Sequence, residues 1–281
     1  MSSPVLHDRL SCHPWMDPQR ARLPGLSPIK EADWLLRDGR YGEQMASRER
    51  LLCDARDDVF QRAPAFEPEA DAVSTVLLDC VLRILKADPG FIGAENLSTI
   101  ATPDGRLIDP DKDHPLVTLG RLVQEDFAIL TPEEAGHYRL IAGLICFPAS
   151  WTLAQKIGRS LTGLHGPVTA YDAGLAARLN RIFAALRPGI LVTRANVLIY
   201  ADPDLYQPRA EGESKPLPAG GPRYVRVERQ TLYPVDVPSV GRAIVFSIHT
   251  SVVTAARLAA YDPQAFATLR AQRPGLFEDD Y

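Results

Sequence analysis

Three strand-like segments in the last third of the chain constrain the fold more than any other feature of the sequence. They run from Ile190 to Tyr200, from Tyr224 to Tyr233 and from Ala243 to Val253, and each is rich in β-branched and aromatic residues with partial alternation. Between the first two, Asp202 to Pro222 is dense in Pro, Gly, Glu and Arg and predicts a solvent loop. Consecutive strands joined by loops or tight turns predict an antiparallel meander.

The preceding part of the chain mixes helical and strand patterns. Ala70 to Lys86 and Ala170 to Leu186 carry apolar residues at helical spacing, and each is followed by a Pro-Gly stop signal. Phe127 to Leu130 and Tyr138 to Phe147 have the length and composition of strands. The sequence therefore predicts an α+β protein.

Three further segments predict shorter helices. Asp33 to Cys53 has helix-compatible spacing that Gly39 and Gly42 divide into short pieces. Lys156 to Leu161 indicates a short helical piece, and Ala255 to Arg273 indicates a closing helical segment.

Composition and local motifs narrow the functional classes. The net charge is −4 and no basic stripe is present, so we expect neither nucleic acid nor an anionic membrane as a partner. The first twenty residues lack the apolar core of a secretory signal, and no run of about 18 apolar residues occurs, so we expect a cytoplasmic protein with four free thiols. Dinucleotide, P-loop, zincin and α/β-hydrolase motifs are missing.

A row of polar residues on the predicted meander is the first candidate site. Side chains alternate across a strand, so Arg226, Glu228 and Gln230 share one face, and Arg194 with Asn196 shares a face of the preceding strand. If the two strands pair, all five line one concavity. The row predicts either a solvated face with cross-strand ion pairs or a polar pocket wall that holds anions with Arg and a cation with Glu.

Two histidines are candidate ligands. His165 lies between a helical piece and Gly166-Pro167, in a turn that can aim its ring into a cavity. His249 lies in the middle of a strand, where core packing with one hydrogen bond is the expected role.

An ordered set of short segments resembles one known family. The segments are Gln124-Glu125-Asp126, Phe147-Pro148-Ala149-Ser150-Trp151, Lys156-Ile157-Gly158, Leu164-His165-Gly166-Pro167-Val168, Arg194-Ala195-Asn196 and Arg226-Val227-Glu228-Arg229-Gln230-Thr231-Leu232. In order and spacing the chain resembles the haem-dependent oxidative N-demethylase α-subunit family from about Pro14 to about Ala260.

The resemblance implies a PAS-like fold, in which an antiparallel sheet with helices on one side cups a b-type haem. It divides the chain into an N-terminal arm and helical extension (1–95), a PAS-like haem-binding core (96–254) and a C-terminal helical tail (255–281). In this family the haem uses O2 to oxidise a methyl group of a small methylated amine, which yields formaldehyde and the lower amine. Electrons come from NADPH through flavin and iron–sulfur partner subunits or a separate reductase.

The resemblance also implies roles for individual residues. His165 matches the axial ligand of the haem iron. Glu228 becomes the counter-charge and base for an alkylammonium substrate. The residues expected to pair the propionates or to order the pocket are Arg194, Asn196, Arg226 and Arg229.

Departures from the family pattern leave alternatives open. Val197 stands where an aromatic residue is expected, and Thr169 where a second Pro is expected. In the last strand His249 replaces an expected Arg, which makes His249 a second candidate for iron or propionate binding. The family resemblance does not identify which amine is the substrate. The competing functions are a haem-binding PAS sensor of gas or redox state, and a partner protein that has lost haem.

Overall fold

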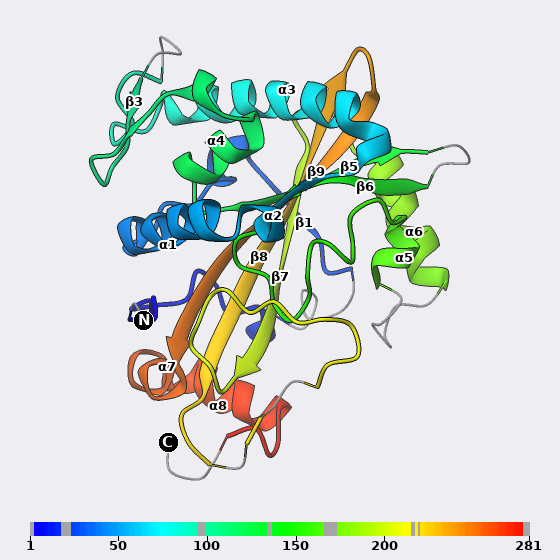
Figure 1. Ribbon diagram of the computed structural model, residues 1–281. Coiled ribbons are helices and arrows are strands. Elements are labelled where there is room, and N and C mark those ends of the chain that lie inside the picture. The colour runs from blue at the N-terminus through cyan, green and yellow to red at the C-terminus, as the bar shows by residue number, and fades with distance from the viewer. Residues whose placement is uncertain are drawn as a thin grey trace.

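The central element is an antiparallel sheet of seven strands in the order β1-β7-β8-β9-β5-β6-β2 (Figure 1). The computed structural model describes residues 3–17, 24–94, 99–133, 137–165, 173–214, 217–218 and 220–277, without the side chains of residues 162, 165 and 173–177. The strands are β1 (Ser27–Ile29), β2 (Phe60–Arg62), β5 (Asp126–Pro132), β6 (Tyr138–Leu144), β7 (Leu191–Tyr200), β8 (Tyr224–Val237) and β9 (Gly241–Thr254), and β3 (Ile100–Ala101) pairs separately with β4 (Leu107–Ile108). The predicted α+β class and the meander of β7, β8 and β9 are confirmed.

The sheet has two faces that bury different residues. On the face that we call the back face, Phe127, Ile129 and Val235 pack in a core with the helices α1, α3 and α4. On the opposite front face, Leu130, Leu140 and Leu232 pack in a second core with α5 and α6. Helices therefore cover both faces. Their bounds are α1 (Tyr41–Asp54), α2 (Arg56–Val59), α3 (Glu67–Leu85), α4 (Pro115–Leu122), α5 (Leu161–His165) and α6 (Ala173–Ala185).

The N-terminal arm and the C-terminal tail pack together at one end of the sheet (Figure 1). The tail forms α7 (Ala255–Tyr261) and α8 (Pro263–Gln272), which share a core with Trp15 and the back face of β7 and β8. Trp15 belongs to the short 3-10 helix η1 (Pro14–Met16), and its indole N–H donates to the Ala265 carbonyl at 2.8 Å. The other 3-10 helices are η2 (Glu31–Asp33), η3 (Pro64–Phe66) and η4 (Pro110–Lys112).

Three local predictions are corrected by the structure. Gly42 does not divide a helix, because it lies in the first turn of α1, where backbone amides have no intrahelical partner. The segment 156–158 is a turn in which Gly158 has a φ of +77°, so the helix starts only at Leu161. The loop after β7 is not wholly solvated, since Leu205 and Gln207 are buried.

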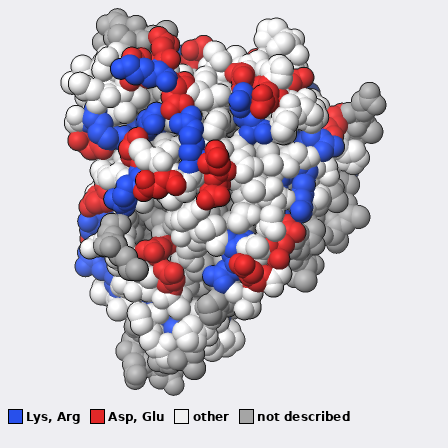
Figure 2. Space-filling view, viewed as in Figure 1, with Lys and Arg blue, Asp and Glu red and all other residues white. Residues whose placement is uncertain are grey.

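Among the described residues, no helix has the length and apolar character needed to cross a bilayer. All four cysteines lie within the described residues, and none of them forms a disulfide. On the side of the molecule that Figure 2 shows, basic and acidic side chains lie interspersed instead of forming a patch of one sign.

Candidate functional site

A cavity of about 660 Å³ lies against the front face of the sheet. Its walls come from β5, β6, β7, β8 and β9, and from α5, α6 and the loop after β7. This volume is typical of a site for a small molecule or cofactor. Most of the lining is apolar and includes Leu130, Leu140, Ile145, Leu232, Phe246 and Ile248.

One wall of this cavity is polar and comes from β7 and β8. Antiparallel pairing sets Arg194 opposite Gln230 and Asn196 opposite Glu228, and all four residues line the cavity. The predicted pairing of these strands is therefore confirmed, and the polar row faces a cavity instead of open solvent. Arg226 lies next to this row on the same face of β8 but is not part of the lining.

Glu228 is the centre of the polar wall. Its Oε1 accepts a hydrogen bond from Arg226 Nε at 3.1 Å. Its Oε2 accepts from Asn196 Nδ2 at 3.3 Å and from Gln230 Nε2 at 3.4 Å. All three neighbours donate, so the surroundings suit a carboxylate, which only accepts. The side chain is 7% exposed, and the carboxylate is held by three contacts at the edge of an apolar space.

Arg226 is bonded entirely to groups of the protein. It is 1% exposed, and besides Glu228 it donates to the carbonyl oxygens of Leu205 (2.8 Å) and Phe147. Nε, Nη1 and Nη2 each have a partner, so this guanidinium fixes Glu228 relative to two loops. That Arg226 orders the pocket or pairs a propionate stays a prediction.

Two polar atoms in the wall are buried without a hydrogen-bond partner. Arg194 donates through Nη1 to Gln230 Oε1 at 3.2 Å, while its Nε has no partner. Burial lowers the pKa of Arg194 from its usual value, and the charge of Glu228 opposes that shift. The second such atom is Asn196 Oδ1. The wall thus offers one unused donor and one unused acceptor to whatever occupies the cavity.

The sequence of the chain matches one known protein family. A family model described as haem-dependent oxidative N-demethylase, alpha subunit-like, matches residues 25–273. The chain belongs to this family. The matched range contains every strand of the sheet and the whole polar wall. A search of curated proteins found no match.

The cavity fits the haem that the family name specifies. Its apolar walls suit the faces of a macrocycle, and the unpartnered Nε of Arg194 suits an anionic propionate. His165, the predicted iron ligand, is the last residue of α5, and its side chain lies outside the described residues. Its neighbour Leu164 lines the cavity.

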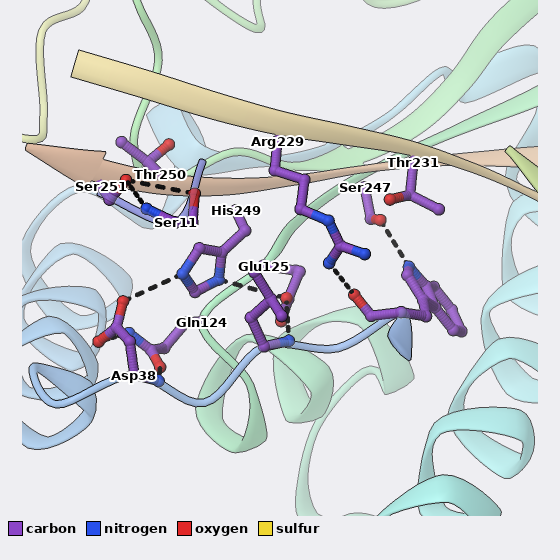
Figure 3. A network of polar contacts seen from close by, with 12 residues as sticks. Ser11, Asp38, Gln124, Glu125, Arg229, Thr231, Ser247, His249, Thr250 and Ser251 are labelled. Atoms are coloured by element: carbon purple, nitrogen blue, oxygen red, sulfur yellow. Dashed lines mark hydrogen bonds and ion pairs between the residues drawn. The ribbon is translucent and has the colours of Figure 1, made fainter. Parts of the chain in front are cut away.

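The structure does not bring Arg229 and His249 to the cavity, because both belong to the back face (Figure 3). Arg229 donates to the carbonyl oxygens of Asp33 and Trp34. His249 has Nε2 3.1 Å from Asp38 Oδ2 and Nδ1 3.3 Å from Glu125 Oε1. Both ring nitrogens therefore face carboxylates, and alternation along β8 and β9 separates these residues from the polar wall.

The carboxylates around His249 change its titration. Burial by itself lowers the pKa of His249, but Asp38 and Glu125 outweigh it and raise the value to about 9. Burial raises the pKa of Asp38, while its hydrogen bonds to His249 and His7 outweigh that effect and hold it well below the usual range. His249 is thus a buried imidazolium, where the sequence predicted one hydrogen bond in a core.

Lys156 links the cavity wall to the loop after β7, and the sequence predicted no role for its side chain. Lys156 lines the cavity, and its Nζ donates at 2.7 Å both to Glu211 Oε1 and to the Leu164 carbonyl. Ser150, with a φ of +63°, lines it too and has its hydroxyl 3.1 Å from the Tyr200 hydroxyl. Lys156 and Ser150 both lie in the short segments that carry the family resemblance, and this was the sequence feature that could have pointed to them. Neither side chain belongs to a recognisable motif of its own.

Proposed function

We propose that this chain is the haem-binding subunit of an oxidoreductase that removes a methyl group from a small amine. The observation that carries the proposal is the Glu228 carboxylate, held by three donors beside an apolar cavity, in a chain of this family. Arg226 already balances this carboxylate, but a cation that enters the apolar space itself needs a counter-charge, and Glu228 is a carboxylate that borders that space.

Individual residues have separate roles in this proposal. His165 ligates the iron, and Arg194 pairs a propionate through its free Nε. When bound, the haem b supplies an iron that binds O2 and oxidises the methyl carbon. The reaction balances when the amine, O2, two electrons and two protons give formaldehyde, the demethylated amine and water.

Glu228 acts on the amine itself. Its carboxylate holds the alkylammonium ion and accepts a proton from nitrogen, which leaves the free amine that is easier to oxidise. Arg226 keeps the carboxylate aimed at the cavity. In this proposal the electrons come from NADPH through flavin and iron–sulfur partner subunits or a separate reductase, as the family resemblance implies.

The absorption spectrum of the purified protein tests the haem. We expect a Soret band, after reconstitution where necessary, and a strongly altered band in His165→Ala. No Soret band in the reconstituted protein overturns the proposal. An unchanged spectrum in His165→Ala overturns the assignment of the ligand.

Turnover separates this enzyme from a haem-binding sensor. With a reductase, O2 and candidate methylated amines, we expect formaldehyde in proportion to NADPH consumed. Glu228→Gln is expected to keep its haem and to lose the spectral shift that amines induce. Haem with no formaldehyde from any amine favours the sensor.

A further inference from the structure

The hydrogen bonds of the polar wall fix which way its two amides point. Arg194 only donates, so the atom of Gln230 that it contacts is Oε1, and the Gln230 amide nitrogen faces Glu228. The carboxylate only accepts, so Asn196 also turns its amide nitrogen toward Glu228. The free atom of Asn196 is therefore its carbonyl oxygen, buried without a partner.

A buried acceptor without a partner selects its ligand by chemistry. A propionate offers only acceptors and gains nothing from Asn196 Oδ1, so this oxygen does not suit the expected role in haem binding. An N–H of an ammonium ion does suit it, and such charge-assisted hydrogen bonds are the strong ones. Glu228 is bonded to the same amide and lies in the same wall.

We infer that Asn196 determines substrate specificity, by accepting a second N–H from an ammonium ion whose first N–H binds Glu228. This inference rests on the proposed function, in which the cavity binds an amine. It predicts a preference that depends on the number of N–H donors. Ammonium ions with at least two N–H groups satisfy both oxygens, whereas a trialkylammonium ion has one N–H and a tetraalkylammonium ion has none, which leaves Asn196 Oδ1 unpaired.

Isothermal titration of the purified protein with dimethylammonium, trimethylammonium and tetramethylammonium chlorides tests this. We expect the unchanged protein to bind dimethylammonium at least about tenfold more tightly than trimethylammonium, as one lost charged hydrogen bond requires. In Asn196→Leu the ratio is expected to fall to about one. An undiminished ratio in that variant overturns the inference, as does a variant that alters haem affinity and leaves the ratio intact.

A matched control comes from a second buried asparagine. Asn180 also has a buried Oδ1 without a partner, but it does not line the cavity. Asn180→Leu is therefore expected to keep the wild-type ratio, and a similar fall in both variants contradicts a local role for Asn196. Should Asn196→Leu misfold, Asn196→Ala removes the same acceptor without added bulk and is held to the same criterion.

Glu228→Gln separates failure of this inference from failure of the proposed function. If the proposed function is wrong, the unchanged protein binds none of these ions, or Glu228→Gln binds them equally well. If only the role of Asn196 is wrong, Glu228→Gln loses binding while Asn196→Leu keeps the preference for dimethylammonium.

Discussion

Strands β8 and β9 carry two polar regions, one on each face of the sheet, and the two regions differ in their surroundings. On the front face, Glu228 and its neighbours border a cavity and leave Arg194 Nε and Asn196 Oδ1 without partners. On the back face, His249 lies between Asp38 and Glu125 and does not line the cavity (Figure 3). Buried atoms without a hydrogen bond occur in both regions, since Glu125 Oε2 and His249 Nδ1 also have none, although His249 Nδ1 faces the Glu125 carboxylate at 3.3 Å. What distinguishes the front region is that its residues line the cavity, which gives a ligand room beside them.

The comparison predicts that the largest loss of stability follows from changes behind the sheet. Arg48 of α1 and Asp126 of β5 form an ion pair at 2.8 Å in which neither side chain is more than 1% exposed. Arg48→Met leaves a buried carboxylate uncompensated, so we expect about 3–5 kcal/mol less stability in urea unfolding.

A surface pair provides the matched control for that measurement. Arg242 and Asp236 are 2.8 Å apart but are 28% and 53% exposed. Arg242→Met is expected to leave the free energy of unfolding nearly unchanged. Equal losses in the two variants contradict the special importance of the buried pair.

A pH-dependent effect of similar origin is expected from His249. Its pKa is raised from 6.5 to about 9 in the folded protein. The stabilisation is therefore fully present below pH 6.5 and is lost as the pH rises through about 9. We expect a loss on the order of 3 kcal/mol between these limits.

His249→Gln tests the source of that pH dependence. The variant is expected to be less stable at pH 6 and to show a flatter stability curve between pH 6.5 and 9. An identical slope in the variant and the unchanged protein assigns the effect to another group.

On the front face, Glu228→Gln is expected to act on binding. Replacing the carboxylate removes a charged acceptor from the cavity, so ammonium affinity is expected to fall by about 1.5–3 kcal/mol, or roughly 10-fold to 150-fold. Calorimetric titration measures the loss. Retained affinity means that the cation is bound elsewhere.

The smallest stability effect is expected from Arg194→Leu. Arg194 is half-buried, its Nε is buried without a partner, and burial lowers its pKa, so the folded protein gains little from its charge. We expect a change within about 1 kcal/mol in unfolding, together with weaker haem retention in a spectrophotometric titration. A loss as large as that of Arg48→Met removes the distinction between the two faces.

Much of the fold and part of the candidate site follow from local sequence patterns. The apolar repeat of Ala70 to Lys86 gives α3, and the alternating segments give β7, β8 and β9. Alternation also groups Arg226, Glu228 and Gln230, since strand geometry alone puts them on one face. The predictions of a helix break at Gly42 and of a helix over Lys156 to Leu161 were wrong. Glycine is tolerated in the first turn of a helix, whereas the positive φ of Gly158 is not helical.

The sequence alone therefore established the meander of β7, β8 and β9 and the division of its residues between two faces. Only the tertiary structure decided which face holds the cavity. The covers of the two faces come from distant segments, with α5 and α6 in front and Asp38, Glu125 and α1 behind. Alternation is a local property of one strand and was enough to group Glu228 with Arg226 and Gln230, whereas the partners of His249 come from distant segments. Long-range packing therefore placed His249 away from the cavity, although the family pattern had made it a candidate for haem binding.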